Sequence, residues 1–245
     1  MKNKYRVIYQ PRGAAREYSE LAVNLYVGCE HGCKYCYAPS CMLKERSSYH
    51  ENVYSRKNIL NLIQKDLIDM SMLKDKRRVL FCFITDPYQG EYEFNKLTSE
   101  ALALFKAYNI PKQVLTKGGM KSARDFHLYK KGDALASTLT FYDEQKSLYW
   151  EPNASLPEDR IKSLKKAKEK GIETWASFEP VIDPEETYKL FMETKDFTDM
   201  YKIGKINNFR TGIEVDWRKF TKNIIELCEK YQKKYYIKES LKPFM

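Results

Sequence analysis

Apolar and polar positions change their spacing repeatedly along this chain, and the changes predict strands and helices in turn. Short, nearly continuous apolar runs are typical of strands buried on both faces. They occupy residues 21–27, 79–84, 113–116, 134–140, 173–182, 200–206 and 235–238. Apolar residues at helical spacing lie between them, in residues 58–73, 98–108, 122–130, 157–170, 184–193 and 216–230. Strand and helix therefore alternate about six times.

Two of the predicted helices carry signals at their ends. Thr98 is the expected N-cap of its helix, because it precedes Glu100 and Ala101. Gly171 follows the helix over 157–170, at the position where a C-cap glycine is expected.

This alternation predicts an α/β fold with a parallel sheet and helical crossovers. Right-handed crossovers of this kind build either a doubly wound sheet or a complete or partial barrel. In both architectures, ligands collect at the carboxyl ends of the strands. Polar residues suited to chemistry follow several predicted strands, namely Gly28-Cys29, Thr85-Asp86, Thr116-Lys117, Thr138 to Thr140, Glu179-Pro180 and Asn207-Asn208.

The length and charge of the chain add two expectations. Its 245 residues suit one full-sized domain, which we place at 21–245 with a final helix and strand, after an N-terminal extension at 1–20. The formal net charge is +10 and the isoelectric point is about 9.1. Such a balance favours a polyanionic partner such as nucleic acid, and it equally fits a lysine-rich solvated surface.

The cysteines and the apolar runs bear on the compartment. Three of the six cysteines lie within eight residues, whereas Cys41, Cys82 and Cys228 are scattered, which is unlike a disulfide scaffold. Residues 1–10 contain no apolar signal-peptide core, and the longest apolar run, 79–84, is too short to span a bilayer. We therefore expect a cytoplasmic protein without a membrane partner.

Cys29, Cys33 and Cys36 form a C-x3-C-x2-C pattern. These spacings also fit one face of a buried helix. Gly28 and Gly32 disfavour a helix, however, and suit a backbone that wraps around a metal. Structural zinc takes four ligands and usually a second cysteine pair, which is missing here, although His31 could complete a zinc site. Three thiolates suit a [4Fe–4S] cluster with one open iron.

With Tyr35 at its aromatic position, this motif resembles the C-x3-C-x-aromatic-C signature of the radical S-adenosylmethionine (SAM) superfamily. Further stretches, over roughly residues 12–185, are similar to the spore photoproduct lyase-like group of that superfamily. They are residues 24–29, His31, Tyr35-Cys36-Tyr37-Ala38-Pro39, Thr85-Asp86-Pro87-Tyr88-Gln89, Leu115-Thr116-Lys117, Glu151-Pro152 and Pro180-Val181-Ile182.

The resemblance implies a partial (β/α)6 barrel of the TIM type. It also implies a [4Fe–4S] cluster held by Cys29, Cys33 and Cys36, SAM as cosubstrate, and an electron donor such as flavodoxin or ferredoxin. Reductive cleavage of SAM at the cluster would give a 5′-deoxyadenosyl radical that removes hydrogen from a substrate.

The resemblance also assigns roles to single residues. Tyr35 would contact the adenine, Thr138 the nucleoside, Lys117 the SAM carboxylate, and Thr85 with Asp86 the SAM amino group. Tyr37 would be a catalytic radical relay, and Glu179 would contact SAM or substrate. Four of these residues have simpler interpretations. Asp86 would cap a turn before Pro87, and Lys117 would be a solvated loop lysine. Tyr37 would be a packed loop aromatic, and Glu179 would pair with a lysine.

The leading functional hypothesis is a radical SAM enzyme acting on a nucleic-acid or nucleotide substrate, in lyase-like repair or modification. The alternatives are a radical SAM enzyme modifying a peptide or small metabolite, and a non-catalytic zinc-binding module. One departure weighs against the lyase reaction itself. Spore photoproduct lyases carry a hydrogen-donating cysteine two residues before the Ser/Thr-Asp pair, where this chain has Phe83. Cys82 is expected on the opposite face of the strand.

Overall fold

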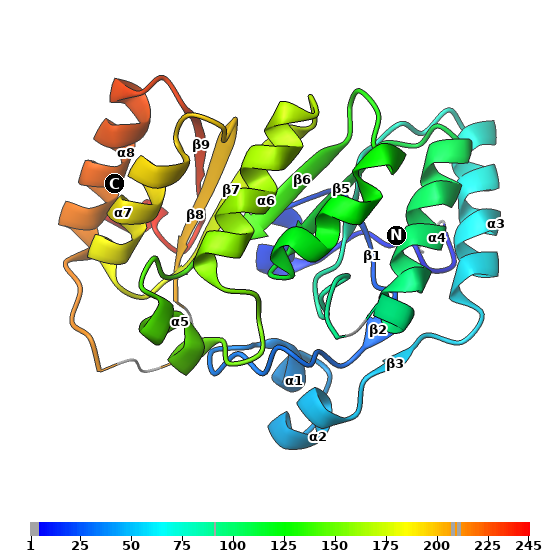
Figure 1. Cartoon of the computed structure of the whole chain (residues 1–245), viewed down its shortest axis with the longest axis horizontal. Helices are drawn as coiled ribbons and strands as arrows, with labels where there is room; N and C mark the ends of the chain where they lie inside the picture. Colours follow the sequence, from blue (N-terminus) through cyan, green and yellow to red (C-terminus); the bar gives the residue numbers. More distant parts are fainter. Residues whose placement is uncertain (1–4, 91, 207–208, 210–211) are drawn as a thin grey trace.

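A computed structural model of the chain describes residues 5–90, 92–206, 209 and 212–245, and only the backbone of residues 92–95. Among the described residues, seven parallel strands form one sheet in the order β1-β4-β5-β6-β7-β8-β9 (Figure 1). The strands are β1 (Leu21–Val23), β4 (Val79–Phe81), β5 (Lys112–Thr116), β6 (Ala134–Thr138), β7 (Glu173–Val181), β8 (Met200–Lys205) and β9 (Lys234–Ile237).

The strand order decides between the two predicted architectures. Each strand pairs with the next one along the sheet without a reversal of order, whereas a doubly wound sheet reverses at a switch point. Strands β1 and β9 stand at the two edges, so the described sheet is an open, partial barrel. The predicted partial barrel is confirmed.

Helices connect the successive strands and lie along one face of the sheet (Figure 1). They are α3 (Ile59–Met72), α4 (Tyr92–Ala107), the 3₁₀ helix Gly119–Leu128, α6 (Pro157–Glu169), α7 (Pro184–Thr194) and α8 (Trp217–Lys230). Large apolar clusters fill the space between the strands and these helices. A smaller cluster with Ala22, Leu80 and Trp175 covers the inner face and includes Tyr18 of the N-terminal segment.

The chain from 5 to 20 packs against the barrel. The Asp66 carboxylate on α3 accepts hydrogen bonds from the backbone N–H groups of Arg6, Val7 and Ile8. A 3₁₀ helix, Gly13–Glu17, then leads to Tyr18, which is buried. This segment therefore supplies side chains to the inside of the barrel.

Three predicted elements differ from the structure. The apolar run 21–27 splits into β1 and β2 (Tyr26–Val27), because Asn24 between them accepts hydrogen bonds from the N–H groups of Phe83 and Ile84 and turns the chain. Strand β2 pairs instead with β3 (Tyr54–Ser55). Helix α4 begins at Tyr92 rather than after Thr98, whose hydroxyl donates to the Pro87 carbonyl from within the helix.

The predicted α-helix over 122–130 is a 3₁₀ helix that starts earlier, at Gly119. The Ser122 hydroxyl donates to the Gly119 carbonyl at 2.7 Å and lies 2.8 Å from Ser163 of α6. These local contacts favour the tighter turn. The short helices α1 (Ala38–Cys41), α2 (Arg46–Glu51) and α5 (Glu144–Trp150), and the 3₁₀ helix Lys242–Phe244, were not predicted.

Helices α1, α2 and α5 follow strands β2 and β6 and lie at one end of the molecule (Figure 1). The carboxyl ends of the parallel strands face this end, where ligands bind in such folds. The predicted strand-end pair Asn207-Asn208 lies outside the described residues. Among the described residues, no helix is both long enough and apolar enough to cross a membrane.

Candidate functional site

The site begins with a loop after β2 that carries Cys29, Cys33 and Cys36. Gly28 starts this loop with a φ of +88°, a backbone conformation that favours glycine. A Cβ atom on Gly28 would come within 2.8 Å of the Tyr49 carbonyl oxygen and 2.9 Å of the Asn52 carbonyl oxygen. Glycine therefore lets the loop lie directly against α2.

Side chains of α2 bind the backbone of the cysteine loop. Arg46 donates from Nη1 to the Cys33 carbonyl at 3.0 Å and from Nη2 to the Cys36 carbonyl at 2.7 Å. His50 Nδ1 lies 2.7 Å from the Cys29 carbonyl oxygen. Each cysteine carbonyl of the motif is thus fixed by α2, which leaves the three thiols for another partner.

The loop is bound on its other side by the chain that follows α5. The Lys34 N–H donates to the Trp150 carbonyl at 2.9 Å, and the Asn153 N–H donates to the His31 carbonyl at 3.2 Å. The Asn153 side chain also donates to the Glu30 carbonyl at 2.8 Å. The motif is therefore held between α2 and the end of α5.

The three thiols are free and close enough to influence one another. Burial raises the pKa of Cys33 to about 12, while the Lys117 ammonium acts to lower it. Among the described residues, no three His, Cys, Asp or Glu side chains are arranged to hold a single metal ion. Three cysteine thiolates are a donor set that fits an iron–sulfur cluster.

The segment after β4 fixes the start of the loop. The Thr85 hydroxyl donates to the Gly28 carbonyl at 2.7 Å and accepts a hydrogen bond from Gln89 Nε2 at 2.6 Å. Gln89 Oε1 in turn accepts from the Glu30 N–H at 2.7 Å. Thr85 is buried here as a support for the loop.

Asp86 joins two strand ends to the cysteine loop. Its Oδ1 accepts from the Tyr88 N–H at 2.8 Å and from the Thr116 hydroxyl at 2.6 Å. Its Oδ2 accepts from the Lys117 N–H at 2.7 Å and lies 3.6 Å from His31 Nδ1. Asp86 thus caps the turn, as its simpler interpretation expects, and its contact with SAM stays a prediction.

Glu151 gathers three of the predicted residues around one buried carboxylate. It accepts a short hydrogen bond from the Tyr35 hydroxyl, which also lies 3.1 Å from Thr140 Oγ1. Arg160 Nη1 is 2.7 Å from Glu151 Oε2 and donates to the Thr138 carbonyl at 3.1 Å. Lys117 Nζ lies 3.9 Å from Glu151 Oε1 and 5.4 Å from the centre of the Tyr35 ring.

The charges of this group stay in place at neutral pH. Burial acts to raise the pKa of Glu151, but Arg160 and Lys117 outweigh it and hold that pKa below its usual value. Burial acts to lower the pKa of Lys117, but the electrostatic effects of Cys33 and Glu151 outweigh it and raise that pKa. Arg160 Nη2 is buried without a hydrogen-bond partner among the described residues. Two cations, Lys117 and Arg160, therefore face two carboxylates at this edge of the barrel, Glu151 and Asp86.

Residues 23–198 match the sequence model of the Radical SAM superfamily. The chain belongs to the radical SAM superfamily. Members of this enzyme family use a [4Fe–4S] cluster and SAM, which confirms the predicted cofactors and removes the non-catalytic zinc-binding alternative.

Three proteins are similar to this chain in sequence or in fold. An uncharacterized protein of Methanocaldococcus jannaschii is 29% identical over 197 residues, or 77% of this chain and 71% of the relative. Spore photoproduct lyase complexed with dinucleoside spore photoproduct is similar in fold, with a TM-score of 0.73 and 12% identity over 97% of this chain and 80% of that one. Streptococcus suis SuiB bound to SAM is similar in fold, with a TM-score of 0.65 and 12% identity over 89% of this chain and 50% of that one.

Glu179 and Tyr37 lie apart from the group around Glu151 in this radical SAM barrel. Glu179 accepts short hydrogen bonds from the Tyr18 hydroxyl and the Lys238 ammonium on the inner face. The Tyr37 side chain is 54% exposed, and its hydroxyl donates to the Phe83 carbonyl at 2.9 Å. Their roles toward SAM and substrate stay predictions.

Phe83 and Cys82 differ in their surroundings. The Phe83 ring packs edge-on against Tyr18 at 5.9 Å in the inner cluster. Cys82 is buried in the cluster between sheet and helices. The two side chains therefore lie on opposite faces of the sheet, and Cys82 does not take the place of the lyase cysteine that this chain lacks.

No role was predicted from sequence for Glu151, Arg160, Arg46 or His50. Glu151-Pro152 is one of the stretches similar to the spore photoproduct lyase-like group, and this similarity was a signal that Glu151 has a functional role. Arg160 lies on a lysine-rich helix that resembles an ordinary solvated face, although the side chain is 1% exposed. Arg46 and His50 belong to a short helix without a clear apolar pattern.

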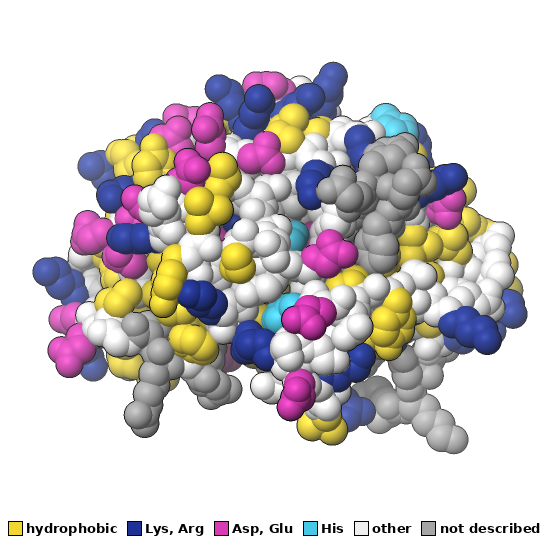
Figure 2. Space-filling model, turned by 60° about the horizontal axis from the view of Figure 1, so that its bottom comes forward, with side chains coloured by type: hydrophobic (Ala, Val, Ile, Leu, Met, Phe, Trp, Pro, Cys, Tyr) yellow, Lys and Arg dark blue, Asp and Glu magenta, His cyan; other side chains and the backbone are white. Residues whose placement is uncertain are grey.

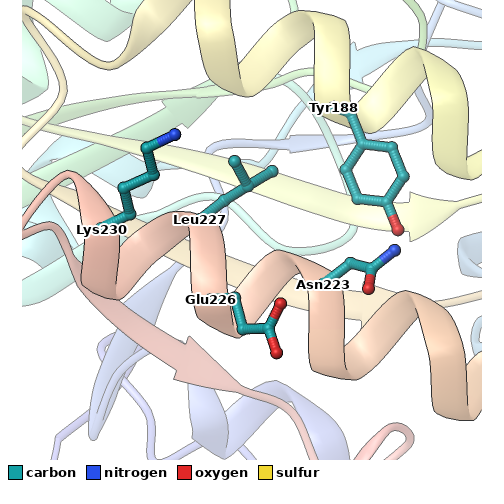
Figure 3. A pocket seen from close by; sticks show the side chains of 5 residues that line it. All are labelled: Tyr188, Asn223, Glu226, Leu227 and Lys230. Carbon is teal, nitrogen blue, oxygen red and sulfur yellow. The ribbon is translucent and has the colours of Figure 1, made fainter.

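A separate hollow of about 340 Å³ lies between α7 and α8 (Figure 3). Its lining is formed by Tyr188, Asn223, Glu226, Leu227 and Lys230. These residues belong to helices on the outer side of the barrel and not to the carboxyl ends of the strands, so the hollow is separate from the site.

Proposed function

We propose that Cys29, Cys33 and Cys36 hold the [4Fe–4S] cluster and that this enzyme acts on a nucleic-acid or nucleotide substrate. The observation that carries the first part is a loop of three free thiols, fixed by its carbonyls and placed beside the cationic group of Lys117 and Arg160. When bound, cluster and SAM supply a radical able to remove hydrogen from a substrate.

The residues around Glu151 suit the binding of SAM. Lys117 keeps its positive charge, and Arg160 Nη2 remains to be paired, so both favour a carboxylate ligand. Tyr35 is fixed by Glu151 and offers its backbone and ring beside the cysteines. Thr138 ends β6 next to Arg160, which supports its predicted contact with the nucleoside.

Two observations support the nucleic-acid substrate. The net charge of +10 favours a polyanion. Spore photoproduct lyase, which is similar in fold, was solved with a dinucleoside photoproduct. Phe83 in place of the lyase cysteine favours a modification or repair reaction other than that of the lyase.

A peptide or small-metabolite substrate has less support. SuiB shares the fold, but this chain spans 50% of its length. Beyond residue 185 the only cysteine of the sequence is Cys228, which lies on α8 with its side chain buried in the core. It is therefore not placed to bind a second cluster.

We also propose the cytoplasm as the compartment and reduced flavodoxin or ferredoxin as the electron donor. All six cysteines lie within the described residues and are free thiols, which suits a reducing compartment.

The test compares release of 5′-deoxyadenosine from SAM by anaerobic, reduced enzyme with different additions. Irradiated DNA, undamaged DNA or RNA should raise the release, and an equal mass of random peptides should not. Cys33→Ala should abolish the release, whereas Cys41→Ala, which removes an exposed cysteine outside the motif, should retain it. Stimulation by peptides alone would overturn the substrate assignment and leave the cofactors in place.

A further inference from the structure

Aromatic side chains gather where α5 meets the cysteine loop. Trp150 stacks on Phe141 at 6.2 Å with an interplanar angle of 19°. It also meets Tyr149 edge-on at 5.5 Å and Phe209 at 5.7 Å. We call Phe141, Tyr149, Trp150 and Phe209 the aromatic platform.

The outer part of the platform is open to solvent, whereas Phe141 beneath Trp150 is buried. Tyr149 is 61% exposed and Phe209 is 37% exposed, and the neighbouring Tyr142 is 45% exposed. Figure 2 shows hydrophobic side chains and a basic side chain gathered on this part of the face that carries α5. Exposing large aromatic side chains to water is unfavourable, and such exposed apolar groups often mark a binding surface.

The platform is joined to the cluster-binding loop. The Lys34 N–H donates to the Trp150 carbonyl at 2.9 Å, and Lys34 Nζ lies 3.0 Å from the centre of the Tyr149 ring. Lys34 follows Cys33 directly in the chain. A ligand on the platform therefore reaches the mouth of the barrel, where the proposed reaction takes place.

Charged side chains of both signs surround the platform, including the exposed Glu144 in the first turn of α5. Asp143 accepts from the Lys146 N–H at 2.8 Å as the N-cap of α5. The Lys146 ammonium lies 2.8 Å from Asp183 and 3.2 Å from Glu186, so these carboxylates are already paired. Among the described residues, Lys34 is in no ion pair, and its ammonium lies over the Tyr149 ring.

We propose that the aromatic platform stacks the bases of a single-stranded segment next to the reacting nucleotide, with Lys34 on its backbone. This inference rests on the proposed function. Exposed rings beside a cation are the arrangement by which proteins hold unpaired bases. A duplex keeps its bases stacked on one another, so it cannot offer their faces to Tyr149.

The experiment measures fluorescence anisotropy of a labelled single-stranded DNA of about twelve nucleotides, a length that one such surface spans. Tyr149→Ala should weaken binding by about fivefold or more, because one stacked base contributes that much. Tyr149→Phe should keep the affinity. The matched control is Tyr54→Ala, since Tyr54 is 51% exposed and lies 5.4 Å from Lys44 Nζ but belongs to no aromatic platform.

A second variant tests the backbone contact. Lys34→Gln should lower the slope of log affinity against log salt by about one, because one phosphate contact is lost. The wild-type enzyme should bind the single strand more tightly than the duplex of the same sequence.

Four results would overturn the inference. Binding unchanged by Tyr149→Ala, or a duplex bound as tightly as the single strand, would remove the platform and leave the proposed function standing. Slower reduction by flavodoxin in Tyr149→Ala, with unchanged DNA affinity, would assign the platform to the electron donor. A wild-type enzyme that binds no DNA or RNA would overturn both proposals. Circular dichroism of each variant confirms that it is folded.

Discussion

At the scale of single residues, Glu151 is the side chain that connects the other polar residues of the site. Its carboxylate meets Tyr35, Lys117 and Arg160 and is fully buried. Sequence patterns indicated Tyr35 and Lys117 individually, because each stands in a recognisable motif. They could not indicate that Arg160, on a lysine-rich helix, turns inward to pair with Glu151, since that depends on how α6 packs.

Glu151→Gln should lower the free energy of unfolding by about 3–5 kcal/mol, because it leaves buried cations without their carboxylate. Urea unfolding of the metal-free chain measures this loss. Glu144→Gln on the exposed face of α5 is the control and should change the free energy by under about 0.5 kcal/mol. A loss of less than about 1 kcal/mol for Glu151→Gln would show that the buried pair is not required.

Gly28 is a second residue whose replacement tests the site. Position 28 has a positive φ, and a Cβ there would meet the carbonyl oxygens of Tyr49 in α2 and of Asn52 after it. We therefore expect Gly28→Ala to shift the cysteine loop and to lower the amount of bound iron. Gly171→Ala is the matched control. Gly171 also has a positive φ, of +73°, but a Cβ there meets no atom within 4 Å.

Gly171→Ala should therefore cost only about 1 kcal/mol of stability and retain its iron. Colorimetric iron determination after anaerobic reconstitution compares the two variants. Equal iron in both would show that the close approach of the loop to α2 is dispensable.

At the scale of elements, the sequence predicted the helices and strands whose periodicity is strong. The helix over 157–170 and Gly171 after it appear almost as predicted in α6. The failures have local polar causes. Asn24 ends β1 by binding two N–H groups, and Ser122 favours a 3₁₀ turn. Helix α5 lacks an apolar stripe, because its aromatic residues contact other rings and solvent rather than the core.

At the scale of the whole molecule, the N-terminal segment and the last strands meet inside the barrel. Lys202 of β8 donates to the Glu17 carbonyl at 3.0 Å and the Tyr18 carbonyl at 2.8 Å. Burial, together with the charge of Lys238, lowers the pKa of Lys202 to about 8. Strand alternation places Lys202 on the inner face, but nothing in the sequence shows that residues 17–18 fill that space.

The pKa of Lys202 predicts a pH dependence of stability. In the unfolded chain its pKa is about 10.4, so between pH 8 and that value the unfolded state binds more protons. Stability from this residue therefore rises with pH over this window and is lost as the pH falls through about 8.

Urea unfolding at pH 7 and at about pH 9.5 should show a gain of about 1–2 kcal/mol that Lys202→Met lacks. Comparing the variant with the wild type cancels the contribution of other groups. The same pH response in both proteins would contradict the depressed pKa.

The central claim is that Cys29, Cys33 and Cys36 hold a cluster to which SAM binds. Electron paramagnetic resonance of the anaerobically reconstituted, dithionite-reduced enzyme, recorded with and without SAM, tests it most directly. We predict a reduced [4Fe–4S] signal that changes when SAM is added, and its loss in Cys33→Ala but not in Cys41→Ala. A signal that does not change when SAM is added, or that is the same in Cys33→Ala as in the wild type, would contradict the account.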